Sequence, residues 1–325
     1  MRHLALLFLL PFLSYHQRAA AQGCSDAGVC TAGPMGQIAA VGDSTAPEPR
    51  HMARLMTSYA LGEQGVAIVQ VQPELSLGLT ERLSIQVKVP YISASGNLGD
   101  NSGVGDVIST LSYAFIKERD RDLTAIAGLR LPTGRFTPES FEQATYGPNA
   151  RPLPMPYQLG LGTTDLLLGV SYRKDRWRGT LAYQHILTQD NQSTFLHRYW
   201  QDVPEALGYF ESLALERTDD AVVRIQYAVP IKRLTLQPGL LAIYHLGEDS
   251  RLEYNDPTGN LEIPDRVNIA GSEGLTLNIT ADARYRLNDA WAIEASFGSP
   301  LVVREVRPDG LTRSMVLNAG LRFAF

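Results

Sequence analysis

Histidine and carboxylate side chains are the first candidates for catalytic chemistry, and the chain holds only six histidines. Four lie beyond the leading segment, namely His51, His185, His197 and His245. His245 stands close to Glu248 and Asp249, and such a group could activate water or bind a divalent cation. A polar cluster at the base of a loop is the alternative. No G-x-S-x-G, H-E-x-x-H or phosphate-loop motif is present, and no serine stands beside His185, so we predict neither an enzyme, a cofactor nor a metal site.

A second pattern places an acidic or amide residue seven positions before an aromatic residue. The pairs are Asp106–Tyr113, Asp165–Tyr172, Asp220–Tyr227, Asn278–Tyr285 and Asn318–Phe325. Because seven is odd, the members of each pair point to opposite faces if the segment is a strand. The three aspartates would then lie at one height on an inner face, and the aromatic residues would form a girdle at a membrane interface.

Two interpretations of the three aspartates are open. They could form an acidic collar that selects cations or hydroxyl-bearing solutes. Alternatively, each carboxylate could pair with a basic side chain such as Arg130, Lys88 or Arg224 and brace the wall. We favour the second interpretation, because charged groups away from bulk water are usually paired.

The elements that would position these residues are strands, because apolar and polar residues alternate with period two along most of the chain. In residues 83–91, for example, every odd position is apolar or aromatic and the even positions up to Lys88 are polar. The predicted strands cover residues 53–62, 66–79, 82–92, 104–116, 121–132, 162–174, 176–188, 218–230, 232–247, 273–287, 290–304 and 312–325. Tight turns separate some of them, and long polar loops are predicted at 93–103, 133–161, 189–217 and 248–272.

About twelve long antiparallel strands, each with one apolar face, predict an all-β transmembrane barrel of the bacterial outer membrane. No stretch after the leading segment approaches the roughly twenty apolar residues of a spanning helix. A soluble sandwich or lipocalin-type barrel is the alternative, but sandwich strands are typically shorter, about 5–7 residues. If Phe325 ends a strand in the periplasm, the N- and C-termini and all tight turns lie there, and the long loops lie outside the cell.

The expected partners follow from this topology. We expect the barrel-assembly machinery to read the aromatic Phe325 at the end of the last strand. Outer-membrane lipid and lipopolysaccharide would surround the wall, and the barrel is expected to be a monomer. The 325-residue chain has a formal net charge of −5, whereas a nucleic-acid-binding protein would show a basic excess.

The first residues have the layout of a secretory signal peptide. A basic start at residues 1–3 precedes an apolar run over 4–13, and Ala19–Ala21 offers a cleavage site of small residues. We therefore predict export with cleavage near Ala21, so that residues 1–21 are the signal peptide and 53–325 the barrel.

Between the predicted signal and barrel lies segment 22–52, which we interpret as a periplasmic tether or a partial plug. The chain has two cysteines, too few for a disulfide framework. In an oxidising compartment Cys24 and Cys30 could close a small disulfide loop. Two free thiols, or a lipid-modified Cys24, are the alternatives.

Polar residues on the inner faces of the predicted strands would line the lumen. They are Gln70, Glu74, Lys88, Asp106, Arg130, Asp165, Arg224 and Asp282. Such a lining predicts a channel that admits small solutes passively. A closed structural or adhesive barrel with partner-binding loops, and a hydrolase at the rim around His245, are the alternatives.

Two long loops carry further candidates. The proline-rich loop 133–161 could fold inward and constrict the pore, or it could cover the rim. Four aromatic residues in loop 189–217 could contact an aromatic solute, form a small loop core or anchor the loop at the lipid interface. They are Tyr199, Trp200, Tyr209 and Phe210.

Five short motifs between about residues 75 and 175 stand in a characteristic order. They are LTERL at 79–83, VPY at 89–91, GVGDV at 103–107, LPTG at 131–134 and LGLGTTD at 159–165. This ordered set resembles the outer-membrane transporter family named for the meta-pathway of phenol degradation. The resemblance implies an outer-membrane channel for small aromatic or other hydrophobic compounds.

Overall fold

The fold is all-β in the computed structural model, which describes residues 50–134, 151–254, 263–311 and 313–325. The helices of the described part are 3-10 turns of three to five residues, at Glu63–Gly65 (η4), Met155–Tyr157 (η7), His197–Tyr199 (η8) and Pro204–Gly208 (η9). None of the described helices is long and apolar enough to cross a membrane. The predicted signal peptide, most of segment 22–52, Cys24 and Cys30 lie outside the described residues.

The described residues also contain seventeen strand segments. In the first half they are β1 (His51–Gly62), β2 (Ala67–Gly78), β3 (Leu83–Lys88), β4 (Tyr91–Gly96), β5 (Gly99–Val104), β6 (Val107–Lys117), β7 (Arg121–Leu131), β8 (Thr163–Lys174) and β9 (Trp177–Gln189). In the second half they are β10 (Asp220–Tyr227), β11 (Val229–Ile231), β12 (Leu234–His245), β13 (Ser250–Glu253), β14 (Asp265–Asn268), β15 (Gly274–Arg286), β16 (Trp291–Val302) and β17 (Arg313–Ala324).

The sheet closes into a barrel because β1 pairs with both β2 and β17. Three strands are interrupted, so that β3 continues into β4, β5 into β6 and β10 into β11. Counting each interrupted strand once gives a closed antiparallel barrel of twelve strands, with β13 and β14 as a separate hairpin. The predicted fold class is therefore confirmed.

The break between β3 and β4 falls at Val89–Pro90, where proline has no amide to donate to the ladder. The neighbouring backbone compensates, since Val89 N–H donates to Pro73 O (3.2 Å) and Gly105 N–H donates to Pro90 O (2.8 Å). The break between β5 and β6 falls at Gly105 and Asp106, on the adjacent strand. The two interruptions thus lie opposite each other on adjacent strands.

The prediction that residues 93–103 form a loop is wrong. These residues continue the barrel wall as the hairpin of β4 and β5, paired from Tyr91–Val104 to Gly96–Gly99. Their glycine, serine and asparagine content suggested a loop, but Ile92, Ala94 and Leu98 pack into an apolar cluster with loop residues from elsewhere. That long-range packing stabilises the hairpin.

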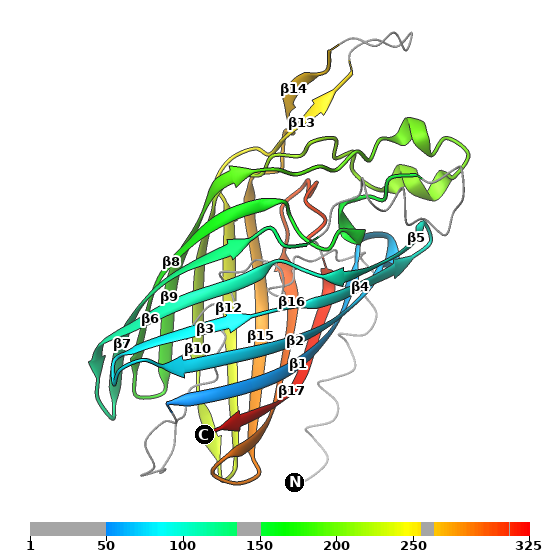
Figure 1. Ribbon diagram of the computed structural model, residues 1–325. Helices are drawn as coiled ribbons and strands as arrows, with labels where there is room; N and C mark the ends of the chain where they lie inside the picture. Colours follow the sequence, from blue (N-terminus) through cyan, green and yellow to red (C-terminus); the bar gives the residue numbers. More distant parts are fainter. Residues whose placement is uncertain (1–49, 135–150, 255–262, 312) are drawn as a thin grey trace, which may run out of the picture.

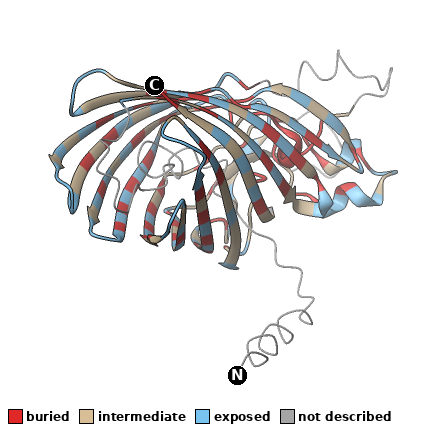
Figure 2. Ribbon diagram, turned by 90° about the horizontal axis from the view of Figure 1, so that it is seen from below, coloured by how far each residue is buried: buried red, intermediate tan, exposed pale blue. Residues whose placement is uncertain are grey.

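Alternation separates the two faces of the wall. On β2, Val69, Val71 and Leu75 are exposed on the outer face, whereas Gln70 and Glu74 are buried on the inner one. The same banding of buried and exposed residues runs along the other strands (Figure 2). The barrel is therefore apolar outside and mostly polar inside. The inner face also carries one apolar cluster, made of Ile108, Ile126, Leu167, Ala182, Val222, Leu241 and Ile243.

The two ends of the barrel differ, and we name them by their connections. At the turn end, tight turns join neighbouring strands and β17 finishes beside the start of β1 (Figure 1). There Phe325 N–H donates to His51 O (3.0 Å), and the two rings stack with centroids 5.6 Å apart. At the loop end, the long connections and the β13–β14 hairpin extend beyond the wall (Figure 1).

Aromatic side chains gather around the turn end, as the seven-residue spacing predicts. Trp177 packs on Tyr227 (ring centroids 4.8 Å apart) and Trp291 on Phe323 (4.6 Å). Most members of the predicted girdle are exposed on the outer face, namely Tyr113, Tyr172, Tyr285 and Phe325. Rings in this position suit the boundary between hydrocarbon and water.

Candidate functional site

The eight residues predicted to line the lumen are all buried within the barrel wall. Their exposed fractions run from 0% for Asp165 to 8% for Asp106, and the set is Gln70, Glu74, Lys88, Asp106, Arg130, Asp165, Arg224 and Asp282. Because the outer face of each strand is apolar, burial of these polar residues places them on the inner face. Their partners fall into the groups that follow.

The first group joins β1, β2, β3, β15 and β16 across the inside of the wall. Glu74 lies 3.7 Å from Lys88 Nζ and 3.4 Å from Arg54 Nη1, and Arg54 Nε lies 3.2 Å from Glu294. Glu294 in turn accepts a hydrogen bond from Arg284 Nε at 2.7 Å. Sequence reasoning missed Arg54, Arg284 and Glu294, although their polar positions in alternating runs were a usable signal.

A second group lies on β10 and β15. Asp282 accepts hydrogen bonds from Arg224 Nη2 (2.7 Å) and Gln226 Nε2 (2.8 Å). Both donors lie on β10 and reach past β12, so the pairing ties strands that are not hydrogen-bonded neighbours. Charges on this inner face are thus compensated in place.

The three aspartates of the seven-residue pattern all have partners. Asp165 forms an ion pair with Arg130, as predicted, and accepts a hydrogen bond from Gln184 Nε2 at 2.6 Å. Asp220 pairs with neither Lys88 nor Arg224. Its partners are Arg217 and His245 at the loop end. The interpretation as bracing groups fits this geometry better than a ring of free carboxylates.

Asp106 braces the wall through backbone amides. Its two carboxylate oxygens accept hydrogen bonds from Gly134 N–H (3.1 Å) and Leu161 N–H (3.0 Å), which stand near the two ends of one long connection. A Cβ at Gly160 would collide with this carboxylate, so the close approach needs glycine there. The motifs around Asp106 and Gly160 therefore have an architectural role.

His245 lies in a buried cluster at the loop end and not in an open site. Its Nδ1 is 2.7 Å from Asp220 Oδ1, and its Nε2 is 2.7 Å from Asp249 Oδ1 and 2.9 Å from Thr218 Oγ1. The side chain is 2% exposed, and Glu248 takes no part in these contacts. Since both ring nitrogens are engaged, the arrangement favours a loop-base polar cluster over a general base.

The same cluster anchors the connection between β16 and β17, residues 303–311. The Asp309 carboxylate forms ion pairs with Arg304 Nη2 (2.5 Å) and Arg217 Nε (3.3 Å). Arg304 also lies 3.6 Å from the carboxylate of Asp249. Burial alone would raise the pKa of Asp309, but Arg304 and Arg217 outweigh it and hold that pKa well below its usual range. The carboxylate is thus ionised and binds both guanidinium groups.

A third contact holds this connection to the turn between β1 and β2. Arg307 Nε lies 3.4 Å from Glu63 Oε1. Burial raises the pKa of Glu63 to about 7, because it exceeds the opposing effect of Arg307. We name residues 303–311, held by these contacts, the inner strap. The sequence prediction extended one strand to 304 and missed the strap, although its R-P-D-G segment is a turn signal.

The loops above the strap have an apolar core of their own. Tyr157, Phe195, Trp200 and Tyr209 pack together with Val66 and Leu98 of the wall. Trp200 Nε1–H donates to Pro152 O (2.9 Å), and Leu98 N–H donates to the Tyr157 hydroxyl (3.2 Å). Of the alternatives for these aromatic residues, a loop core is what the structure shows for Trp200 and Tyr209.

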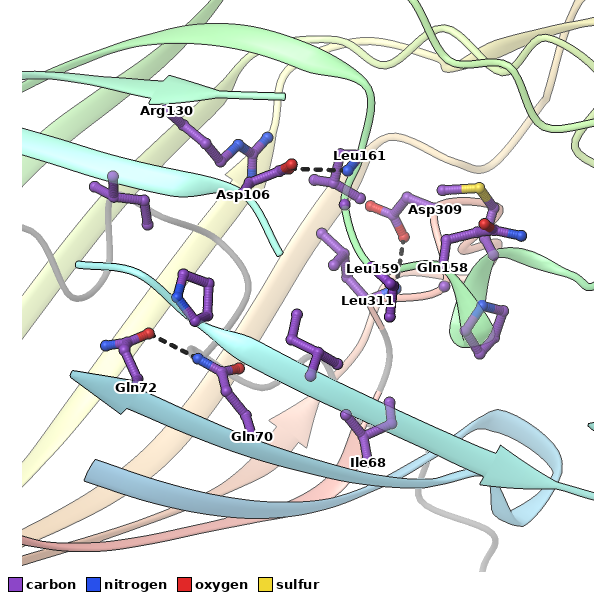
Figure 3. A pocket seen from close by; sticks show the side chains of 17 residues that line it. Ile68, Gln70, Gln72, Asp106, Arg130, Gln158, Leu159, Leu161, Asp309 and Leu311 are labelled. Atoms are coloured by element: carbon purple, nitrogen blue, oxygen red, sulfur yellow. Dashed lines mark hydrogen bonds between the residues drawn. The ribbon is translucent and has the colours of Figure 1, made fainter. Parts of the chain in front are cut away.

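Between the wall and these loops lies a cavity of about 60 Å³ (Figure 3). The wall contributes Ile68, Gln70, Gln72, Pro90, Ile92, Asp106, Ile108 and Arg130; the proline-rich connection contributes residues 155, 156 and 158–161, and the strap Asp309, Gly310 and Leu311. Gln70 Nε2 donates to Gln72 Oε1 at 2.7 Å within it. Gln158 Oε1 is buried without a hydrogen-bond partner.

The cavity brings three of the predicted lumen residues together, namely Gln70, Asp106 and Arg130. Its volume holds a few water molecules and no larger solute. Residues 151–161 of the proline-rich connection pack against the inner face of the wall, where Leu161 N–H donates to Asp106. Residues 135–150 of the same connection lie outside the described range. Within the described residues, no group of three or more His, Cys, Asp or Glu side chains could hold a metal ion.

Comparisons with known proteins identify the architecture. No protein-family model matches the sequence, and neither does any curated protein. Among solved structures, the barrel is similar to an outer membrane channel from Pseudomonas putida F1, with a TM-score of 0.57 and 18% identity over 88% of this chain and 100% of that one. The NanC porin is more distant, with a TM-score of 0.45 and 9% identity over 84% of this chain and all of that one.

At these identities the likeness shows the fold, a barrel of the outer-membrane type. The resemblance to the phenol-degradation family receives no support from these comparisons.

Proposed function

We propose that this protein is an outer-membrane channel that admits small solutes passively, with its loop end outside the cell. The observation that carries the proposal is the inversion of polarity across a closed wall. Large apolar side chains are exposed on the outer face, while some dozens of polar and charged residues are buried inside. A soluble barrel would have the opposite arrangement, because its exterior contacts water.

The eight lumen residues are proposed to line the solute path. Ion pairs join Glu74 with Lys88, Arg130 with Asp165 and Arg224 with Asp282, and backbone amides hold Asp106, so the path offers little net attraction to an ion. The cavity combines aliphatic side chains such as Ile92 and Leu161 with the amides of Gln70 and Gln158. The lining also includes the charged Asp106, Arg130 and Asp309, and it would contact a larger solute only after the strap has moved. On that condition we extend the proposal to hydrophobic or aromatic compounds.

The small cavity makes the loop end the gate of the proposed channel. A solute larger than a few waters needs the inner strap or the 151–161 segment to move. The strap has little secondary structure, and buried ion pairs hold it in place. We therefore expect it to be the element that moves.

The remaining features of the proposal concern export and assembly. Residues 1–21 would be a cleaved signal peptide, the residues from 22 up to the start of β1 at His51 a periplasmic segment with a Cys24–Cys30 disulfide, and the barrel a monomer. The aromatic end at Phe325 would be read by the barrel-assembly machinery, and lipopolysaccharide would surround the loop end.

Single-channel recording in planar bilayers, together with liposome swelling in neutral solutes, tests the proposal. We expect discrete conductance steps and a swelling rate that falls with solute size. A folded, heat-modifiable barrel that gives neither conductance nor swelling would instead favour a closed structural barrel whose loops bind a partner. If the wild-type protein conducts and has no hydrolytic activity, the alternative of a hydrolase at His245 is wrong.

A further inference from the structure

The exposed charges of the protein are distributed unequally between the two ends of the barrel. Among the described residues, the turn end exposes ten arginine and lysine side chains and five carboxylate side chains. By the same measure, the described loop end exposes two arginines, Arg198 and Arg266, and seven carboxylate side chains. The channel proposed above makes no use of the excess of positive charge at the turn end.

The turn-end cations follow the whole rim of the barrel. Five tight turns join β2 to β3, β6 to β7, β8 to β9, β11 to β12 and β15 to β16 (Figure 1). Each turn carries or adjoins at least one exposed cation, namely Arg82, Arg119, Arg176, Lys232 and Arg286. A partner protein would contact one sector of such a ring, whereas the lipids around a membrane barrel contact all of it.

The outer face of β8 shows how these cations stand relative to the membrane. Its exposed residues run from Leu168 and Val170 through Tyr172 of the aromatic girdle to Lys174. Strands rise about 3.3 Å per residue, so at a tilt near 40° Lys174 lies about 5 Å beyond the level of Tyr172. The face of β6 ends in the same order, with Lys117. Apolar, aromatic and cationic residues thus succeed one another as hydrocarbon, interface and headgroups do in a leaflet.

Some of these cations have no counter-ion in the protein. Within the described residues, the side chains of Lys174, Arg176 and Lys232 form no hydrogen bond or ion pair. Asp175 stands between the first two in the sequence and is also exposed, so this turn keeps an excess of one positive charge. The cations are therefore available to an anion outside the protein, and phosphate is the anion that a headgroup layer supplies.

We propose that the turn-end cations bind the phosphate groups of anionic phospholipids in the leaflet that faces the periplasm, with Lys174 and Arg176 forming one such site. The proposal rests on the outer-membrane location and the orientation proposed above. Trp177 is 58% exposed and pairs with Lys174 across β8 and β9. A lipid that contacts the Trp177 ring at the interface therefore has its headgroup beside both cations.

The test is quenching of Trp177 fluorescence by brominated lipids in liposomes. The chain has three tryptophans. Trp200 is buried in the loop core, and Trp291→Phe leaves Trp177 as the tryptophan of the girdle. The Trp291→Phe barrel is refolded in phosphatidylcholine liposomes that contain brominated phosphatidylglycerol or, separately, brominated phosphatidylcholine. Heat modifiability on gels confirms that every variant folds.

Two double variants in this background separate the site from net charge. Lys174→Gln with Arg176→Gln removes the proposed site, and Arg198→Gln with Arg266→Gln removes the same charge from the loop end as a matched control. We expect phosphatidylglycerol to be preferred about fivefold over phosphatidylcholine around Trp177. The turn-end variant should lose this preference and the loop-end variant should keep it. Salt at about 1 M should weaken the preference, because it screens exposed charges.

Equal quenching by the two lipids in the parent barrel would overturn the proposal and favour an acidic periplasmic partner for the turn end. A preference that survives the turn-end substitutions, or that the loop-end substitutions weaken equally, would overturn it as well. Lipids quench Trp177 in any folded and inserted barrel, whether or not it conducts. The outcome is therefore separate from that of the channel test.

Discussion

Replacing Asp309 with alanine should release the inner strap. In the folded protein this carboxylate contacts Arg304 and Arg217 and accepts Leu311 N–H at 3.3 Å. Both guanidinium groups are at most 1% exposed, so the substitution leaves two buried cations with fewer partners. Removing one partner of a buried ion pair costs about 3–5 kcal/mol.

We expect a cost near the lower end of that range, because Arg217 keeps Asp220 (3.2 Å) and Arg304 keeps Asp249. The cost applies to the closed position of the strap and is largely absent once the strap moves into water. A bias of about 3 kcal/mol shifts a closed-to-open equilibrium by about a hundredfold. Open probability in single-channel recordings should rise accordingly.

The assay pairs those recordings with hydrogen exchange of residues 304–311, which should lose protection in Asp309→Ala. Asp289→Ala removes the same charge from an exposed turn at the turn end and serves as the control. If Asp309→Ala folds normally and matches the wild type in both open probability and exchange, the strap is not the gate and the reasoning fails.

Three further predictions concern the wall and the strap. Arg130→Met leaves Asp165 buried without its cation and should lower stability by about 3–5 kcal/mol, measured as urea unfolding in liposomes; an unchanged midpoint would contradict the bracing role. Glu63 has its pKa raised to about 7 from 4.5, so its ionisation opposes folding, and stability should fall by about 3 kcal/mol between pH 4.5 and 7. Glu63→Gln should flatten this dependence of stability on pH. An equal dependence in the variant would assign it to another titrating group. Gly310→Ala should also open the strap, because φ is +66° and a Cβ would lie 2.5 Å from Pro156 N; conductance equal to wild type would rule this out.

The barrel wall was predictable because its signal is local. Period-two alternation depends only on neighbouring residues, and the predicted strands agree with the structure within a few residues for almost every strand. The same signal separated inner from outer positions, and the eight residues predicted to line the lumen are buried polar residues of the wall. That they line a solute path stays a prediction.

The loop end was not predictable, because its contacts join distant parts of the chain. Phe195 and Trp200 pack against Val66 and Leu98, which no pattern along the sequence links to them. The ion pair between Arg304 and Asp249 likewise depends on how two connections meet in space. The hairpin at 93–103 was missed for the same reason, since its stability comes from residues far away in the sequence.

The seam between β1 and β17 has a consequence for biogenesis. Met52 pairs with Ala324 and Leu61 with Met315, so the first strand of the barrel meets its partner only when the last has been made. Before this seam closes, β1 and β17 each have one unpaired edge, which in water invites association with other chains. Pairing at such separation is also slow, because loop closure must precede it. We therefore expect the exported chain to need a holding factor until the seam has closed, and a chain that lacks the last strand to aggregate.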